Sequence, residues 1–180
     1  MFNIGSDIEF MYNSTTLKKA FLESGSNMLS IPVGQEGYPN IESYSELFPF
    51  FEENGELVTD DMWNRLFSSA LSNVNLVINK LVADDYSTTG QFTIDSDIVI
   101  PIKGAEYNEA DLLVADNAIF DALVYGAVAE WYTNTNVEPL VALSKNRAAE
   151  SMSKLIAVVK RLEGVLLRKR LNSPIFDSMI

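Results

Sequence analysis

The chain has 180 residues, no cysteine, no histidine and a formal net charge of −12. That length forms about one domain and can bury a core without disulfides or metal ions. The missing residue types are the commonest ligands of zinc and haem and are needed for Ser-His-Asp and Cys-His nucleophiles. The acidic balance disfavours a protein that grips the phosphates of nucleic acid. We therefore expect a single domain that is not an enzyme and holds no cofactor or metal.

The charge is unevenly distributed. Residues 1–140 hold 22 acidic and 5 basic side chains, whereas residues 141–180 hold 3 acidic and 8 basic ones. Two interpretations remain open. The basic end is either a solvated helix on an acidic domain, or it pairs with the acidic body of another copy or of a partner.

The chain shows no signal for a membrane or for export. No uninterrupted apolar run reaches the ~18 residues of a membrane span. Asp7 and Glu9 interrupt the N-terminus, where a signal peptide needs a basic and then an apolar stretch. We expect synthesis in the cytoplasm and no membrane association.

Residues 1–58 are predicted to be a loop-rich N-terminal region. Residues 1–13 have no clear period and are expected to form an arm or a short turn. Ser14 and Thr15 are candidate N-caps for a short helix that ends near Ser24, because Gly25 follows. The next thirty residues hold five aromatic side chains among prolines and glycines, namely Tyr38, Tyr44, Phe48, Phe50 and Phe51. This pattern predicts a loop, with a short helix near 41–51 as an alternative.

Residues 59–171 are predicted to form the helical core. Thr59 precedes two aspartates in a first helical turn, and apolar residues then recur at helical spacing to Leu81. This pattern predicts a helix over residues 60–83. Its other face is polar but almost uncharged, with Asn64, Arg65, Ser68, Ser72, Asn75 and Asn79. That face is either an ordinary polar surface or is half-buried against another subunit.

The period changes to two in residues 91–102, which predicts a β-ribbon. Phe92, Ile94, Ile98, Ile100 and Ile102 fall on one side. The ribbon is either a hairpin that turns at Asp95–Asp97 or one straight strand. A pair of strands is not stable alone, so we expect the ribbon to lie on the helices or to pair with another chain. Residues 103–111 are predicted to be a loop, followed by an extended piece over 111–115.

Two carboxylate pairs, Asp84–Asp85 and Asp95–Asp97, have the composition of a calcium site or an acid–base pair. The second pair lacks the downstream glutamate of an EF-hand, and nothing else supports either site. We assign no metal ligand and no catalytic residue.

Residues 116–132, DNAIFDALVYGAVAEWY, predict the central core helix. Large apolar side chains recur at three- and four-residue intervals, and small residues between them allow close approach of a neighbour. Glu138 and Pro139 then open a last helix that should run to about Leu171, with its basic residues densest near the end. At ~1.5 Å per residue such a helix is as long as the whole domain, so part of it should project.

Residues 172–180 follow the last helix as an extended tail. Ile175, Phe176, Met179 and Ile180 make this segment apolar. The tail is either a frayed terminus or a segment that docks on a neighbouring molecule.

The order of these elements resembles tailed-phage head–tail connector proteins, also called adaptor or ring proteins, over residues 58–171. The resemblance rests on VTDDMW at a helix start, a ribbon ending in IVIPI, the core helix with DALVYGAVAEWY, and a long basic helix with an apolar tail. The segment Asp121–Ala127 is similar to the central helix of short-tail adaptors and of crAss-like phage ring proteins.

The resemblance implies a mainly α fold, a helical bundle with a β-hairpin. It also implies a homo-oligomeric ring, expected to be a dodecamer, below the portal protein at the head–tail junction of the virion. Double-stranded DNA would pass through this neck without specific binding, and further neck and tail proteins would be partners. An acidic wall fits such a channel because it repels phosphate. The family supplies no catalytic residue.

The residues expected at the contacts between subunits or with partners come from the ribbon, the basic end and the tail: Phe92, Ile94, Ile98, Ile100, Arg168, Lys169, Arg170, Ile175, Phe176, Met179 and Ile180. A different class of function stays open. The chain is alternatively a small cytoplasmic binding or regulatory module that uses the basic helix, residues 145–170, on an acidic partner or nucleic acid.

Overall fold

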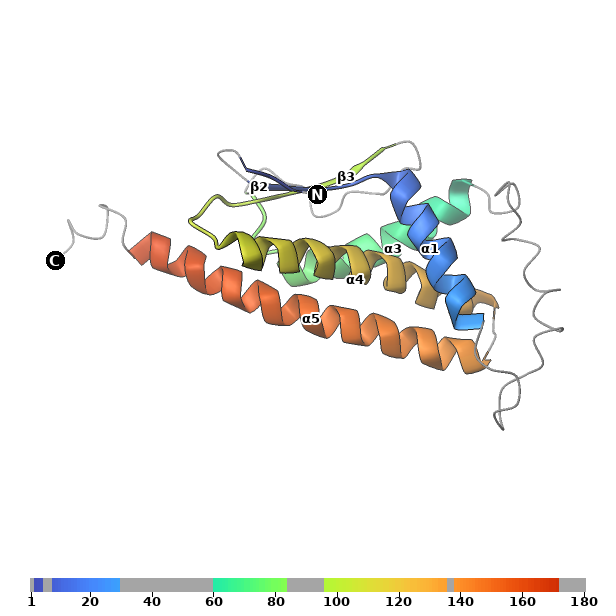
Figure 1. Cartoon of the computed structure of the whole chain (residues 1–180). Coiled ribbons are helices and arrows are strands. Elements are labelled where there is room, and N and C mark those ends of the chain that lie inside the picture. The colour runs from blue at the N-terminus through green and yellow to red at the C-terminus, as the bar shows by residue number, and fades with distance from the viewer. Residues whose placement is uncertain (1, 5–7, 30–59, 84–95, 136–137, 172–180) are drawn as a thin grey trace.

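The computed structural model describes residues 2–4, 8–29, 60–83, 96–135 and 138–171. Within these residues the chain forms four α-helices and one three-stranded antiparallel sheet (Figure 1). This confirms the predicted mainly α fold with a small β element and a long C-terminal helix. The predicted tail, residues 172–180, lies outside the described residues.

The sheet contains strands β1 (Phe2–Ile4), β2 (Ile8–Tyr12) and β3 (Ile98–Ile102), in that spatial order. The expectation that residues 1–13 form an arm or a turn is therefore wrong. In β2, Ile8, Phe10 and Tyr12 are buried while Met11 is exposed. This alternation has the period of two that is typical of a strand with one face on a core. The alternation covers only five residues and has acidic residues in and beside it, so the sequence pattern alone did not indicate a strand.

Strand β3 forms the end of the predicted ribbon, and residues 91–95 lie outside the described residues. Its partner is β2 of the same chain, with Phe10 opposite Ile100. The other edge of β3 is joined near its end by the segment after the second described helix. The Ala83 backbone N–H donates to the Pro101 carbonyl at 3.0 Å, and the Lys103 N–H donates to the Leu81 carbonyl at 2.8 Å. Strand β3 is thus stabilised within one chain.

Helix α1 spans Ser14–Leu29. Its N-cap is Asn13, whose Oδ1 accepts hydrogen bonds from the backbone N–H groups of Thr15 (3.0 Å) and Thr16 (3.2 Å). The predicted caps were one and two residues too late. The helix also continues past Gly25, contrary to the prediction. A glycine inside a helix costs only about 1 kcal/mol, and here the buried Gly25 carbonyl accepts a hydrogen bond from the Tyr132 hydroxyl.

Helix α3 spans Asp60–Ile78 and begins where the two aspartates predicted it. It ends five residues before the predicted Ala83. The reason lies in the sheet, because residues 81–83 leave the helix to pair with the edge of β3. Three apolar residues remain buried there, namely Leu81, Val82 and Ala83. They belong to a strand-like segment and not to a further helical turn.

Helix α4 spans Glu109–Thr135, seven residues longer at its start than the predicted core helix. The Asn108 side chain caps it by accepting a hydrogen bond from the Ala110 N–H at 2.9 Å. Glu109 and Asp111 lie in the first turn, where the helix dipole favours acidic groups. The extended piece predicted over residues 111–115 is therefore wrong. An asparagine followed by acids was the start signal that sequence reasoning overlooked.

Helix α5 spans Glu138–Leu171, as predicted, and is the longest element. It runs beside α4 in the opposite direction, so that Arg161 of α5 meets Asp111 near the start of α4. Figure 1 shows the last turns of α5 extending past the first turn of α4. This agrees with the expectation that part of the helix projects.

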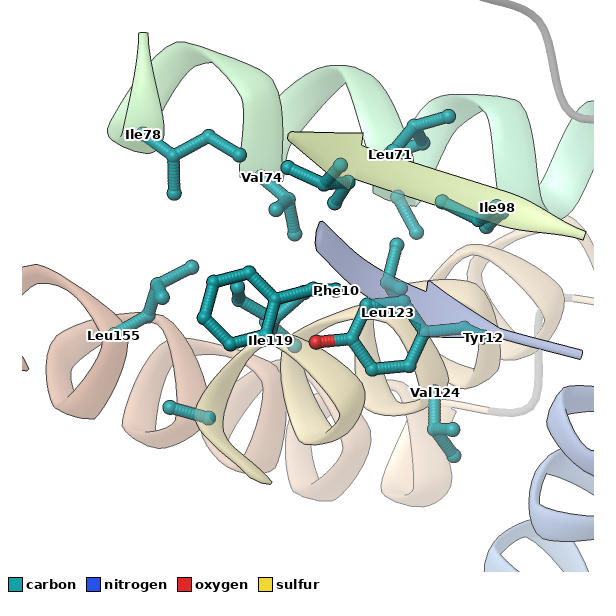
Figure 2. Close-up of a cluster of buried hydrophobic side chains, with 14 of the residues drawn as sticks. Phe10, Tyr12, Leu71, Val74, Ile78, Ile98, Ile119, Leu123, Val124 and Leu155 are labelled. Atoms are coloured by element: carbon teal, nitrogen blue, oxygen red, sulfur yellow. The ribbon is translucent and has the colours of Figure 1, made fainter. Parts of the chain in front are cut away.

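The core lies where α4 meets the sheet, α1, α3 and α5 (Figures 1 and 2). Phe10 comes from β2, Ile78 from α3 and Leu123 from α4, and each is at most 1 % exposed. Gly126 of α4 faces α3 so closely that an added Cβ would lie 3.1 Å from the Ala70 Cβ. The small residues of α4 are therefore needed for the close approach of α3.

Candidate interface surfaces

The two predicted interface residues of the ribbon that the structure describes are not on the surface. Ile98 is 5 % exposed and Ile100 is fully buried, and both belong to the core of this chain. A side chain buried within its own chain offers no area to a neighbour, so the assignment of these two residues to an interface is corrected. Phe92 and Ile94 lie outside the described residues. The described part of the ribbon points its apolar side inward because β2 and the helices already cover it.

At the C-terminal end, the structure describes part of the predicted basic surface. Arg168 is exposed on α5, and its Nε donates a hydrogen bond to the Gly164 carbonyl at 3.3 Å. Lys169 and Arg170 belong to α5, but their side chains lie outside the described residues, as do Ile175, Phe176, Met179 and Ile180. The structure therefore brings no tail residue to a defined place.

The charge division of the sequence is a division between two adjacent helices. Helix α4 carries five acidic and no basic residues, whereas α5 carries three acidic and eight basic ones. Arg161 and Asp111 join them at 3.1 Å. Part of the charge of the basic helix is thus neutralised inside its own subunit.

A second electrostatic interaction joins α4 and α5. Burial raises the pKa of Asp121 above its ordinary value, while the positive charge of Lys154 acts in the opposite direction. Lys154 also lies 3.3 Å from Glu150 on its own helix. The side of α5 that carries Lys154 and Arg161 therefore faces the edge of α4.

Four basic residues of α5 recur at intervals of seven: Arg147, Lys154, Arg161 and Arg168. All four are exposed. A seven-residue interval is close to two full helical turns, so these residues form one basic stripe along the α4 edge of the helix. The ion pairs of Arg147, Lys154 and Arg161 are exposed and are worth only about 0.2–1 kcal/mol each, so the stripe remains available to an acidic partner.

Several large apolar side chains stay on the surface. The most exposed are Leu76 at 72 %, Leu167 at 56 % and Leu113 at 53 %. Smaller exposed fractions belong to Val114, Met11, Ile156 and Val99. Isolated exposed apolar residues are ordinary in soluble proteins, but neighbouring ones are typical of contact sites. Leu113 and Val114 are such neighbours, on one side of the first turns of α4.

The residues on the nearly uncharged face of α3 differ in burial. Asn75 is 2 % exposed and belongs to the interior of this chain, so its amide did not signal a subunit contact. Ser72 is exposed, and its hydroxyl donates to the Ser68 carbonyl one turn earlier at 2.8 Å. This bond satisfies the hydroxyl within the helix. Of the remaining residues of this face, Arg65 and Asn79 are exposed, whereas Asn64 and Ser68 are half-buried.

Two tyrosine hydroxyls of the core have backbone partners. The Tyr12 hydroxyl donates to the Asp116 carbonyl at 3.2 Å, and the Tyr132 hydroxyl donates to the Gly25 carbonyl at 2.9 Å. Burial raises the pKa of both phenols, so both stay protonated and act as donors. These bonds tie α4 to β2 and to α1.

The carboxylates of the described residues do not gather into a metal site. No group of three or more acidic side chains able to hold a metal ion occurs within the part of the chain that the structure describes. Asp97 is exposed and accepts a hydrogen bond from the Asn13 side chain at 3.0 Å. Asp84, Asp85 and Asp95 lie outside the described residues.

Helix α4 is long and apolar enough, by length and composition, to cross a membrane over Glu109–Asn134. Its apolar run is not uninterrupted, because Asp111, Asp116 and Asp121 divide the segment. Most of its apolar part is buried inside the protein, against α1, α3 and α5. The same test is passed by the core helix of a soluble protein, and the packing of α4 is of that kind.

Comparison of the chain with known protein families, with curated proteins and with solved structures gives no match.

Proposed function

We propose that the chain is a structural subunit of a head-to-tail connector ring in a tailed phage, placed below the portal protein. Two things support this proposal. The sequence from Asp121 to Ala127 and the order of the elements resemble connector proteins, and the fold is of the implied class, a helical bundle with a small β element. The proposed location is the head–tail junction of the virion after synthesis in the host cytoplasm.

The single structural observation that carries the proposal is the surface of the α4–α5 hairpin. Leu113 and Val114 are both about half exposed on the acidic helix, and the adjacent helix presents a row of basic side chains. A subunit of a ring needs two different contact surfaces, one on each flank. Apolar residues next to unevenly distributed charge suit such contacts. Strand β3 of the ribbon offers no such surface, because it is paired with β2 of the same chain.

The charge also suits a passage for DNA. The chain as a whole is strongly acidic, with a formal net charge of −12. A wall of that sign repels phosphate and lets a duplex pass without binding it. The proposal accordingly includes no base contact and no catalytic residue.

Size-exclusion chromatography with light scattering, followed by electron microscopy, tests the proposal directly. We expect a ring with a central hole, alone or after mixing with the portal protein of the same phage. A compact monomer that also fails to bind that portal protein would contradict the proposal. Deleting residues 173–180 should abolish assembly and leave helical content unchanged, provided that the tail docks on a neighbour.

A second candidate function is favoured by the basic stripe of α5. Exposed charges at every second turn would suit a small cytoplasmic module that binds an acidic protein or nucleic acid. Binding of labelled duplex DNA, measured as a function of salt concentration, separates the two candidates. A connector should show no binding at physiological salt, whereas a nucleic-acid module should bind and weaken steeply as salt is added.

A further inference from the structure

The α4–α5 hairpin has two separate exposed surfaces, one on each helix. Both contain apolar side chains, and their charged side chains have opposite signs. The first, the α4 patch, consists of Glu109, Ala110, Leu113, Val114 and Asn117. The second, the α5 patch, consists of Ile156, Lys160 and Leu167. All eight residues are exposed.

The α4 patch is one continuous face of a helix. Glu109 and Leu113 are four residues apart, as are Ala110 and Val114, so each pair lies one above the other. Leu113 is 53 % exposed and Val114 is 46 % exposed. Exposed Glu106 precedes the helix at the same end. The patch is therefore apolar in its middle and acidic at its start.

The α5 patch is also one face. At about 100° per residue, its three members fall within about 40° of one another around the helix. Leu167 is 56 % exposed and Ile156 is 39 % exposed, and exposed Lys160 comes between them along the helix. Glu163 lies on the same face, half-buried and 4.0 Å from the Lys80 ammonium group. With Lys160 and Lys80 beside this one acid, the patch is apolar and on balance basic.

The two patches of one subunit cannot meet each other. Arg161 and Lys154 mark the side of α5 that faces α4, through the contact with Asp111 and the charge effect on Asp121. The α5 patch lies roughly a third of a turn away from that side. Its apolar side chains and its lysine therefore point away from the α4 helix of their own chain.

We infer that a second copy of this chain occupies each patch, with the α4 patch of one subunit seated on the α5 patch of the next. Leu113 and Val114 then pack against Leu167, while Glu109, one turn earlier on α4, faces Lys160, two turns earlier on α5. Charge complementarity indicates that the partner of each patch is another copy of this chain. The acidic and apolar groups of one patch match the basic and apolar groups of the other. Two different patches give a head-to-tail contact, which closes into a ring when the rotation between subunits allows it.

Single cysteines test this inference sharply, since the natural chain has none. Leu113→Cys and Leu167→Cys are made as separate proteins, mixed and oxidised. We expect disulfide-linked dimers in the mixture and few in either protein alone. Leu76→Cys is the matched control, because Leu76 is more exposed than either residue but lies on α3, outside both patches. It should not cross-link with either protein.

Charge exchange gives an independent measurement. Lys160→Glu and Glu109→Lys should each raise the dissociation constant of self-assembly about tenfold, and the double variant should regain most of the loss. Leu167→Ser should weaken assembly about tenfold or more, whereas Leu76→Ser should not change it. Circular dichroism of each variant shows whether the subunit is still folded.

The inference rests on the proposed ring, but the two fail differently. Assembly of the natural chain without cross-linking between positions 113 and 167, or with strong cross-linking of either protein alone, would overturn these surfaces and leave the ring standing. A natural chain that stays monomeric at every concentration and also with the portal protein would overturn both.

Discussion

Helices α4 and α5 lie side by side and are of similar length, yet they differ in how much of their surface is buried. Helix α4 is buried along most of its length, and its small residues let α3 approach to the contact distance of Gly126 and Ala70. Helix α5 buries one stripe, with Leu155 and Leu162 inside, and exposes the rest. The comparison teaches that α4 supplies more of the buried contacts of the core, whereas α5 leaves much of its surface, including its basic side chains, exposed.

The largest expected effect comes from removing core volume in α4. Leu123 is fully buried, and Leu123→Ala should lower the free energy of unfolding by about 2–5 kcal/mol, because it loses apolar burial and leaves a cavity. Urea denaturation of the monomeric subunit measures this. The corresponding change in α5, Leu167→Ser, should stay within about 0.5 kcal/mol because Leu167 is 56 % exposed. Equal losses at the two positions would break the comparison.

The next effect concerns how α4 is tied to α1. Tyr132→Phe removes the hydroxyl that donates to the Gly25 carbonyl at 2.9 Å and leaves that carbonyl without this donor. We expect a loss of about 1 kcal/mol, since buried hydrogen bonds contribute about that much. Thermal unfolding followed by circular dichroism measures the loss. No change would show that the bond contributes nothing to the junction of the two helices.

A smaller effect is expected from the ion pair that joins α4 and α5. Arg161→Ala and Asp111→Asn should each cost less than about 1 kcal/mol, because the Arg161 side chain is 64 % exposed and solvent screens the pair. A double-mutant cycle isolates the interaction energy, which should shrink when salt is raised from low to high concentration. An interaction energy of several kcal/mol that does not change with salt concentration would make this ion pair between α4 and α5 a principal source of stability.

The smallest effect is the pH dependence at Asp121, which is half-buried. Burial raises its folded-state pKa above the ordinary 3.8, and Lys154 partly opposes this. An acid with a raised pKa binds its proton more tightly in the folded state. Its contribution to stability is therefore present below pH 3.8 and is lost as pH rises through the raised folded-state value.

Asp121→Asn should abolish this loss. The variant should gain stability relative to the natural chain as pH rises across that window, with a small difference in melting temperature at neutral pH. Melting temperatures measured at several pH values for both proteins give the answer. A variant that becomes less stable than the natural chain as pH rises would show that the attraction of Lys154 outweighs the burial of the carboxylate.

The helices were predictable where the sequence repeats one signal over many residues. Helix α5 agrees at both ends, because proline opens it and the apolar stripe and basic residues continue without interruption to Leu171. Helix α3 begins as predicted because Asp60 and Asp61 suit the positive end of the helix dipole. The apolar period of the central helix was equally clear, but its first seven residues were predicted to be loop and extended chain, since the Asn108 cap is a single short-range signal.

The sheet and the surfaces were less predictable. Strand β2 has five residues, too few for its period to be distinguished from chance, and its partner β3 lies about ninety residues later in the chain. Nothing local specifies such a pairing. The assignment of Ile98 and Ile100 to an interface failed for the same reason, because it assumed that the ribbon had no partner within the chain.

The sequence by itself determined the long helices, the mainly α class and the division of charge, because helix formation depends on residues three and four apart and on caps at the ends. Only the tertiary structure decided which apolar faces are satisfied. Burial of Ile100 by β2 and the exposure of Leu113 and Leu167 depend on contacts between distant segments, and a local pattern records that a side chain is apolar but not what covers it.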